Sequence, residues 1–441
     1  MKLRITGIMI MIAALLAVTA CSPAGGPKPA DQAPGQLTGE ISLWHHYTDR
    51  EAGIYQKLVD DFVAANPGVK VTVNSGQEDP KIVQVVSTGS DADVVIVNLN
   101  DTLGTLCKSL TDLDPFLQRD QIDPATAYTP IFGAATAFEG RRCSLPMTSD
   151  VYGLYYNQEL WSAAGLAEGD LPKTLTELEV VALKLTTYNA DGSIKTLGFN
   201  PLFGFYENAS GSLSQAAKAS WVGPDERSVV GSDPQWQKII SWQKAFVDKI
   251  GYEKLRTFTA ALGDEWSADN AFHQGKVALN LDGEWRVAFI EDQAPKLKYG
   301  TAPFPVLADG GPEYGGGYTS GAVIGINSKS KNTEAAWALV KYLSATTEPV
   351  VELCNGFKNV PTLRSALESP DLEVPEQYRT FIDAASHPAT QTTPVTTLGA
   401  AFSQPLDDFW DRYQQGDGSG LQPGLQKVQE DVNNALDLKG P

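Results

Sequence analysis

The hydrophobic pattern of residues 40–98 predicts three strands. Residues 40–47 (EISLWHHY) follow Gly39 and read as a strand, and residues 69–74 (VKVTVN) alternate between apolar and polar side chains. Residues 92–98 (ADVVIVN) form a nearly continuous apolar run, which is typical of a strand buried on both faces. We therefore expect these three segments to belong to one sheet.

Two helical patterns separate these strands. Ile54, Leu58 and Phe62 recur every four residues, which places them on one helical face, and residues 66–68 (NPG) end that helix. Residues 79–90 (DPKIVQVVSTGS) read as a short amphipathic helix. The order strand–helix–strand–helix–strand predicts a doubly wound α/β sheet, in which ligands bind at the carboxyl ends of the strands.

The rest of the chain mixes extended and helical patterns. Residues 141–161 predict a long extended segment that enters a helix. Residues 267–290 predict a helix up to Gly275, then an alternating strand, then a tight turn that carries Trp285. Residues 313–343 predict a glycine-rich extended run, a polar turn and a helix, and the C-terminal part is again helical and acidic.

The N-terminus reads as an export signal. Lys2 and Arg4 precede sixteen uncharged residues, 5–20, which is shorter than the roughly twenty that span a bilayer. Residues 18–21 (VTAC) resemble a bacterial lipobox, in which cleavage leaves Cys21 as the lipid-bearing first residue. An ordinary cleavage site beside a chance cysteine is the alternative. Two acyl chains on one residue suffice for stable anchoring.

A tether follows the expected anchor. Residues 22–36 are rich in proline, glycine and alanine and cannot bury enough apolar surface to offset the entropy of ordering. We therefore expect a signal peptide over 1–20, a disordered tether over 21–36, and a protein on the outer face of the membrane, attached by its lipid alone.

The length and the net charge of the chain narrow the class of protein to which it can belong. About 400 residues remain after processing, which exceeds one hydrophobic core and predicts two domains. Loss of Lys2 and Arg4 leaves 32 basic residues against 53 acidic ones, so the formal charge moves from −19 to −21. A chain this acidic is a poor candidate for binding nucleic acid or anionic lipid.

No motif predicts a metal or a cofactor. The sequence contains no CxxC, HExxH, GxSxG or phosphate-binding loop, and His45 and His46 would point to opposite faces of a strand. Residues 187–198 lack the first and last acids of a calcium loop and read as a turn. Of the other cysteines, Cys107, Cys143 and Cys354, one pair can form in an oxidising compartment.

Four stretches resemble a known family in order and approximate spacing. They are EISLWHHYTD (40–49), GLYYNQELW (153–161), AFHQGKVALNLDGEW (271–285) and GGYTSGAVIGINSKSKNTEAAWALVKYL (316–343). Together with the lipobox they resemble the extracellular solute-binding lipoproteins of carbohydrate ABC importers, the relatives of the maltose-binding protein. The resemblance covers residues 37–430.

The resemblance implies a type II periplasmic-binding-protein fold: two α/β lobes joined by a hinge that the chain crosses three times. The N-terminal lobe would comprise residues 37–149 and 324–360, and the C-terminal lobe residues 150–323 and 361–441. A sugar would bind in the cleft of a monomer, and the lobes would close over it and deliver it to the membrane permease. Cys107 and Cys143 would then pair within the first lobe and leave Cys354 as a buried thiol.

The resemblance also implies a set of ligand-binding positions. These positions are His46, Tyr47, Asp49, Asn98, Asn100, Asp101, Asp150, Tyr206, Glu207, Trp285, Gly317 and Tyr318. Aromatic faces suit the apolar faces of sugar rings, and carboxylates, amides and imidazoles suit their hydroxyls.

Each position also has a purely structural interpretation. His46 could cap the following helix, and Asn98 and Asp101 could be plain N-caps. Trp285 could fill the core, and it follows Glu284 where the family turn commonly has proline. Tyr206 and Glu207 could belong to a surface loop.

Two other function classes remain open from the sequence. An exported glycosidase would need two carboxylates flanking the scissile bond, and Asp150 with Glu207 could imitate such a pair across a cleft. A structural surface protein would bind no small molecule. The sequence favours capture of a sugar without chemistry.

Overall fold

The computed structural model describes residues 37–439 apart from Ser90. The expected signal peptide, the expected lipid site at Cys21 and the tether over 21–36 lie outside these residues. Among the helices described, none combines the length and the apolar character needed to cross a membrane.

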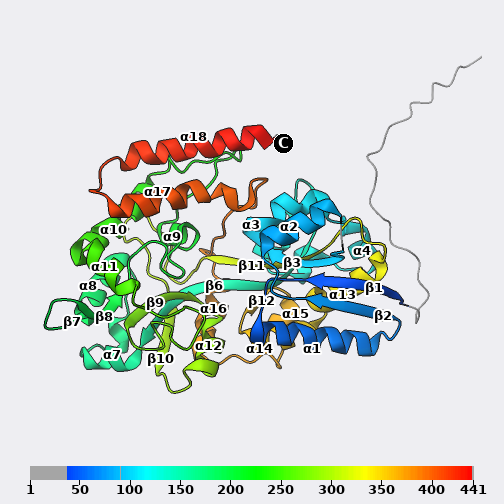
Figure 1. The fold of residues 1–441 in the computed structure, drawn as a ribbon, viewed down its shortest axis with the longest axis horizontal. Coiled ribbons are helices and arrows are strands. Elements are labelled where there is room, and N and C mark those ends of the chain that lie inside the picture. The colour runs from blue at the N-terminus through cyan, green and yellow to red at the C-terminus, as the bar shows by residue number, and fades with distance from the viewer. Residues whose placement is uncertain (1–36, 90, 440–441) are drawn as a thin grey trace, which may run out of the picture.

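One ten-stranded sheet runs through both halves of the molecule, which lie side by side in Figure 1. Its order is β2-β1-β3-β11-β6-β9-β8-β7, and β10 and β12 also pair with β6. The strands, including a separate hairpin of β4 and β5, are β1 Gly39–Trp44, β2 Val69–Asn74, β3 Val94–Asn98, β4 Ala137–Phe138, β5 Arg141–Arg142, β6 Leu145–Asn157, β7 Thr187–Tyr188, β8 Ile194–Phe199, β9 Val277–Gly283, β10 Tyr299–Pro303, β11 Thr319–Ile326 and β12 Val360–Pro361.

Helices cover the faces of this sheet. The α-helices are α1 Asp49–Ala65, α2 Asp79–Thr88, α3 Leu99–Leu106, α4 Asp114–Arg119, α5 Pro124–Ala127, α6 Pro130–Ala135, α7 Gln158–Ala163, α8 Leu175–Leu185, α9 Ser210–Ala217, α10 Pro234–Ile250, α11 Tyr252–Thr259, α12 Arg286–Gln293, α13 Thr333–Ala345, α14 Thr347–Phe357, α15 Arg364–Leu367, α16 Glu376–Ala385, α17 Gln404–Gln415 and α18 Leu421–Lys439. Short 3₁₀ turns are η1 Cys107–Ser109, η2 Glu168–Asp170 and η3 Gly399–Phe402.

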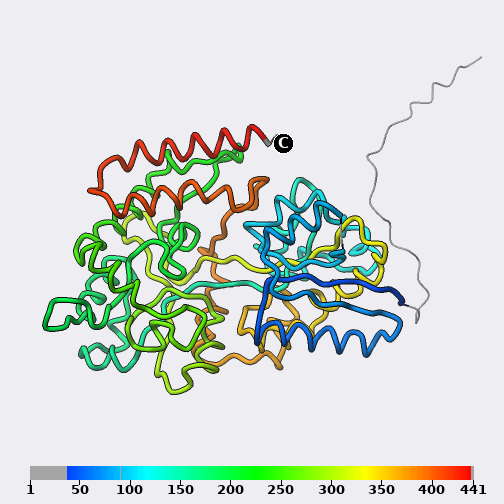
Figure 2. Tube along the Cα trace, viewed as in Figure 1, coloured from blue at the N-terminus to red at the C-terminus, as the bar shows by residue number. Residues whose placement is uncertain are grey.

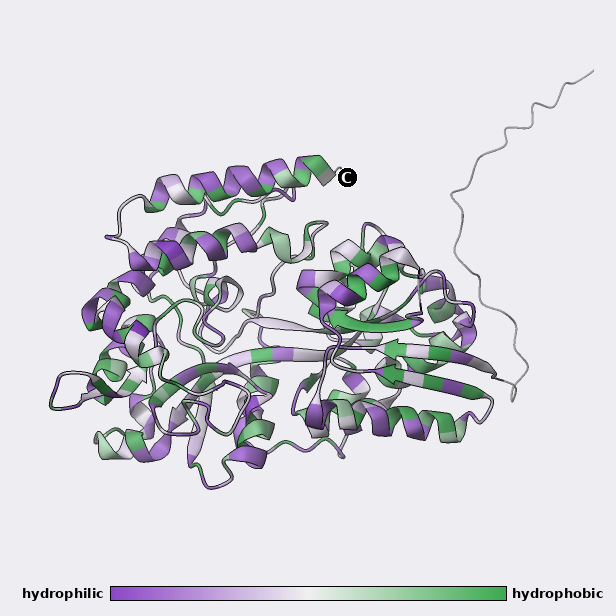
Figure 3. Ribbon diagram, in the orientation of Figure 1, coloured by the Kyte–Doolittle hydropathy of each residue, from purple (hydrophilic) through white to green (hydrophobic). Residues whose placement is uncertain are grey.

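The first lobe forms as its hydrophobic pattern predicts. Strand β1 pairs in parallel with β2 and β3, and helices α1 and α2 provide the crossovers. The apolar stripe of α1 is buried at Leu58 and Phe62, which pack with Ile41 and Leu43 of β1 in one core. Figure 3 shows the strands of this lobe as largely apolar and helices α17 and α18 as largely polar on their visible sides.

Strand β6 links the two lobes. Its first half pairs with β11 between Leu145 and Val151, and its second half pairs with β9 and β10 between Tyr152 and Asn157. The second lobe has its own core, in which Trp236 and Trp410 are fully buried. A change of partner in the middle of one strand therefore places residue 150 and its neighbours where the lobes meet.

The chain also passes between the lobes near its C-terminal end, drawn in orange in Figure 2. Leu363, Ala366 and Leu372 pack into the first core, whereas α16 packs against β6 and β10 of the second lobe. The expected lobe limits at residues 149/150, 323/324 and 360/361 stay a prediction. The packing of these three residues favours a final crossing after residue 372.

One expected helix is absent from the described residues. The segment 267–275 forms successive turns instead of the helix that its pattern predicts. The Asn270 side chain accepts from the amide of Phe272 (2.9 Å) and donates to the carbonyl of Glu265. Local side-chain bonds of this kind compete with helical hydrogen bonding.

The cysteines are arranged as the family resemblance implies. Cys107 and Cys143 form a disulfide with a sequence separation of 36, and both are buried in the first lobe. Cys354 is a buried free thiol on α14, and burial raises its pKa above the usual range.

Candidate ligand-binding cleft

A cleft of two adjoining chambers lies between the lobes, with volumes of about 530 and 430 Å³. Five residues line both chambers: His46, Asn98, Asp150, Trp266 and Trp285. His46 follows β1, Asn98 ends β3 and Asp150 lies within β6. The two tryptophans lie before and after β9, so both lobes contribute walls. Each volume falls in the range of small-molecule sites, which is about 300–1,000 Å³.

Asp79 holds together the wall formed by the first lobe. Its Oδ2 accepts from Thr102 Oγ1 (2.6 Å) and from the amide of Asn98 (3.0 Å), and its Oδ1 lies 3.5 Å from His46 Nδ1. Burial alone would raise the pKa of the Asp79 carboxyl, but His46 and these two donors lower it. Burial opposes protonation of His46, but Asp79 and Asp150 outweigh burial and raise the imidazole pKa. The imidazole of His46 in the first-lobe wall therefore holds its proton more readily than a free histidine does.

A second network joins three segments at the hinge. Asn359 Nδ2 donates to Asp150 Oδ1 (2.8 Å) and to Glu284 Oε1 (2.5 Å), and Glu284 Oε2 accepts from the amide of Val151 (2.5 Å). Burial raises the pKa of Asp150 to about 7 and holds that of the fully buried Glu284 well above its usual value. Glu284, which departs from the common family turn, thus ties β6, β9 and β12 together.

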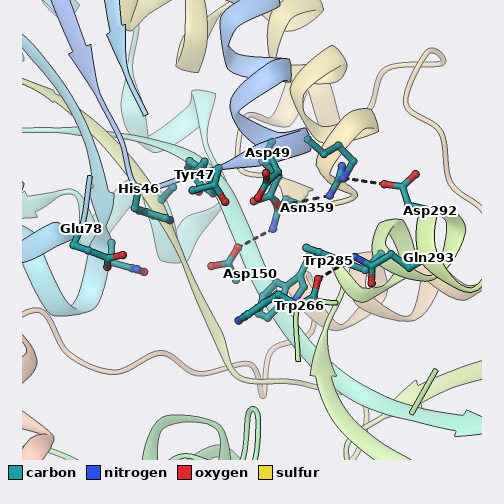
Figure 4. A pocket seen from close by; sticks show the side chains of 16 residues that line it. His46, Tyr47, Asp49, Glu78, Asp150, Trp266, Trp285, Asp292, Gln293 and Asn359 are labelled. Carbon is teal, nitrogen blue, oxygen red and sulfur yellow. Dashed lines mark hydrogen bonds and ion pairs between the residues drawn. The ribbon is translucent and has the colours of Figure 1, made fainter. Parts of the chain in front are cut away.

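Aromatic rings form the wall contributed by the second lobe. Trp285 packs edge-on against Tyr152 (5.4 Å between centroids), and Tyr152 packs against Tyr318 (5.2 Å). Figure 4 shows Trp266 and Trp285 on one side of the cavity, with Asp150 above them. A Cβ at Gly283 would lie 2.2 Å from the Trp285 ring, so this glycine lets the indole fold back into the cleft.

Three carboxylates gather beside this aromatic wall. Oxygens of Glu207, Glu265 and Asp282 lie within 4.8 Å of one another, a spacing that could hold a metal ion. Arg286 donates to Asp282 Oδ2 (2.7 Å) and lies 3.4 Å from Glu265 Oε1. The guanidinium thus already supplies positive charge to this cluster. Burial holds the pKa of Glu207 well above its usual value.

The C-terminal passage closes the second chamber. Asn100 Nδ2 donates to Thr392 Oγ1 (3.0 Å) and to the carbonyl of Thr393, and the hydroxyls of Tyr318 and Thr393 lie 2.8 Å apart. Asn100 belongs to the first lobe, so this passage connects α3 with the start of β11. Ser403 and Asp407 complete the wall from the end of η3 and from α17.

The structure brings most of the expected site residues together. The expected positions that line the cavity are His46, Tyr47, Asp49, Asn98, Asn100, Asp101, Asp150, Glu207, Trp285 and Tyr318. Tyr206 and Gly317 lie outside this lining: Tyr206 Oη accepts from the amide of Ala271 (3.0 Å), and Gly317 N donates to Thr390 Oγ1 (3.2 Å). The ligand contacts themselves stay a prediction.

The structural interpretations of several positions are weaker in this geometry. Thr48, not His46, precedes α1, and the side chain of Asn98 makes no capping bond to α3. Trp285 is only partly buried and lines both chambers.

Sequence reasoning missed a larger set of cavity residues, four of which come from segments that it did not place at the cleft. These four are Trp266, Thr393, Ser403 and Asp407. Trp266 sits in the turns that replace the expected helix, and the others belong to the returning C-terminal segment. The one available signal was the aromatic character of Trp266 in an otherwise polar stretch.

The fold and the cleft define a two-lobed binding protein. The chain belongs to the family of bacterial extracellular solute-binding proteins, whose model matches residues 48–348. A maltotriose-binding protein of Pyrococcus abyssi is 21% identical over 353 residues, covering 79% of this chain and 72% of that protein. A maltooligosaccharide ABC transporter solute-binding lipoprotein of Streptococcus pneumoniae is 26% identical over 353 residues, covering 77% and 75%.

Solved structures share this fold. CpMnBP1 with mannotriose bound has a TM-score of 0.79 and 21% identity, covering 89% of this chain and 99% of that chain. The sugar-binding protein MalE from the phytopathogen Xanthomonas citri has a TM-score of 0.72 and 19% identity, covering 91% and 98%. The two-lobed α/β fold predicted from the sequence is confirmed.

Proposed function

We propose that this protein is the substrate-binding subunit of an ABC importer and captures a saccharide between its lobes. The observation that carries the proposal is the wall shared by both chambers, where Trp266 and Trp285 face the space beside Asp150. Indole faces suit the apolar faces of sugar rings. Ionised or hydrogen-bonded acceptors such as Asp150 suit their hydroxyls, and such bonds are strong when the acceptor is charged.

The relatives support the same ligand class. The P. abyssi relative is named for maltotriose and the S. pneumoniae relative for maltooligosaccharides. The size of the cleft agrees, since each chamber is large enough for a small ligand.

Capture without chemistry accounts for the carboxylates better than glycoside hydrolysis does. Asn359 holds Asp150 within the hinge network, and Glu207 belongs to the cluster around Arg286. Asp150 thus has a structural partner, and the family consists of solute-binding proteins. A binding protein returns its saccharide intact, whereas a glycosidase shortens it.

The anchor and the partner complete the proposal. Lipidation of Cys21 would hold the protein on the outer face of the membrane, and the closed form would dock as a monomer on the permease. The S. pneumoniae relative is named a lipoprotein, which supports this arrangement. Cys21→Ser should move the protein from the membrane fraction to the soluble fraction without lowering its melting temperature; retention after a high-salt wash would contradict the lipid anchor.

A thermal-shift screen tests the proposed function. Purified protein is heated with maltotriose, mannotriose, other neutral oligosaccharides, amino sugars and, as non-saccharide controls, amino acids and short peptides. A ligand at 100 times its dissociation constant adds about 2.7 kcal/mol of stability, which is a readily measured shift. A shift with a saccharide, recovered unshortened by chromatography, is expected. Stabilisation by a peptide or amino acid alone would overturn the proposal.

A further inference from the structure

The second chamber is strongly acidic. Four carboxyl groups and one basic side chain line it: Asp101, Asp150, Glu207, Asp407 and His46. Nδ1 of His46 already lies 3.5 Å from Oδ1 of Asp79, so this imidazole is paired within the first lobe. The chamber therefore offers a ligand several carboxyl groups and no uncommitted basic side chain among the described residues.

Arg286 does not compensate for the carboxyl groups that line the chamber. It hydrogen-bonds Asp282 Oδ2 (2.7 Å) and lies 3.4 Å from Glu265 Oε1. Glu207 completes this group of three carboxylates, and it is the one that lines the chamber. One guanidinium thus faces three carboxyls, and its hydrogen-bond and ion-pair partners are Asp282 and Glu265, not the Glu207 that lines the chamber.

The far end of the chamber has acceptors that lack donors. Asn100 is only 6% exposed, and its amide oxygen is buried with no hydrogen-bond partner within the described residues. The same holds for one carboxylate oxygen of Asp407. Buried acceptors left without a donor are unfavourable, so a ligand group that fits here must donate hydrogen bonds.

These acceptors come from opposite lobes. Asn100 and Asp101 belong to α3 of the first lobe, and Asp407 belongs to α17 of the second. Burial raises the pKa of Asp101, and raises that of Asp407 to about 6, with Asp101 itself contributing to the latter shift. The Asp101 carboxyl of one lobe thus opposes ionisation of the Asp407 carboxyl of the other, and a positive group between them would relieve this repulsion.

We infer that the ligand is a saccharide carrying an ammonium group, bound in the second chamber by Asp101, Asp407 and the Asn100 amide oxygen. This inference rests on the proposed saccharide-binding function and names the class of saccharide. An ammonium group supplies several donors and one positive charge, and charge-assisted bonds to carboxylates are about twice as strong as neutral ones. Glu207 adds further carboxyl oxygens to the wall of the same chamber.

Matched ligands test the inference. Purified protein is titrated by calorimetry at pH 7 with glucosamine, galactosamine and mannosamine, and with β-1,4-linked glucosamine di- and trisaccharides. Each is compared with its N-acetyl and its hydroxyl counterpart, which keep the ring and lose the charge. At least one amine is expected to bind tenfold or more tightly than both counterparts. Equal or tighter binding of the uncharged counterparts, or failure of every amine to bind, would overturn the inference.

Variants of two carboxyl residues test whether the ammonium group is recognised in the second chamber. Asp101→Asn and Asp407→Asn should each weaken amine binding tenfold or more and change binding of the hydroxyl counterpart less than threefold. Asp408→Asn, on the same helix but exposed and outside the cavity lining, is the matched control and should leave both unchanged. Equal losses for charged and uncharged ligands would contradict charge recognition.

Two further outcomes separate the competing explanations. Binding of neutral saccharides alone would leave the proposed function standing and remove this inference, whereas no saccharide binding at all would remove both. Calcium chloride is also titrated without saccharide, because oxygen-only acceptors suit a hard cation. Calcium binding that is lost in Asp101→Asn and Asp407→Asn would replace the ammonium with a metal and overturn the inference.

Discussion

The indole rings of Trp266 and Trp285 lie 6.5 Å apart between centroids, tilted by 37°, on the wall that the two chambers share. Trp285 is held from behind by Tyr152, whereas Trp266 is 49% exposed and packs against the buried Arg286 at 5.3 Å. One ring is thus fixed by the hinge strand and the other can still lose solvent contact when a ligand enters.

Trp266→Ala should weaken saccharide binding without destabilising the fold. The lost contact should cost about 1–2 kcal/mol of binding free energy, because a partly exposed aromatic contributes less than a central hot spot. Tyr188, which is 47% exposed and lies outside the cavity lining, is the matched control. Calorimetry on Trp266→Ala and Tyr188→Ala should show a loss in the first alone; equal affinities would remove Trp266 from the site.

Asp150→Ala should reduce saccharide affinity by about 1.5–3 kcal/mol, because charged hydrogen bonds to a ligand are lost. Asp150→Asn keeps the shape of the side chain and removes its ability to ionise, so it separates the effect of the charge from the effect of packing. We expect the alanine variant to remain folded, because Asn359 Nδ2 keeps its second acceptor on Glu284. Titration of both variants against wild type measures the effect, and unchanged affinity in Asp150→Ala would exclude a direct contact.

The ligand-free protein should become less stable as pH rises from 6.5 to 8.5. Burial raises the folded-state pKa of Asp150 to about 7 and of Glu265 to about 8, above the roughly 4 of unfolded carboxyls. The folded state therefore binds more protons, so this stability is complete below the unfolded pKa and is lost as pH rises through the folded values. Scanning calorimetry at several pH values should show a falling melting temperature.

The chosen pH window avoids an opposing effect, because burial lowers the pKa of His45 and His273 to about 4. These groups add stability as pH rises, but only up to about 6.5, the unfolded histidine pKa. Asp150→Asn removes one titrating carboxyl and should flatten the slope between pH 6.5 and 8.5. A melting temperature that rises across this window would contradict the assigned directions.

Removing the disulfide should lower stability. A loop closed between residues 36 apart contributes roughly 3–4 kcal/mol in the chain-entropy model. The double variant Cys107→Ser, Cys143→Ser should therefore unfold at a clearly lower denaturant concentration, while Cys354→Ala tests the free thiol separately. Non-reducing peptide mapping that joins Cys107 to Cys354 would refute this pairing.

The local fold of the first lobe could be predicted because each segment carries its own periodicity. Predicted strands over 40–47, 69–74 and 92–98 match β1, β2 and β3, and the intervening helices match α1 and α2 to within a few residues. In these segments burial of one face and local preference point to the same structure.

The rest of the cleft could not be predicted because its residues meet only through tertiary structure. Asp407 and Thr393 reach the chamber on a segment that returns across the lobes, and no local pattern records that path. The helix expected before Gly275 is wrong because Asn270 bonds the nearby backbone instead. Trp285 was found from its motif, whereas Trp266 lies in those unpredicted turns.

The most direct test of saccharide capture between the lobes is a calorimetric titration of wild-type protein and Trp285→Ala with the saccharide that gives the largest thermal shift. We expect the variant to lose about 2–4 kcal/mol of binding free energy, or at least 30-fold in affinity, with an unchanged ligand-free melting temperature. Normal binding by a variant that melts far earlier would show that Trp285 is a core residue and that the cleft assigned here does not hold the ligand.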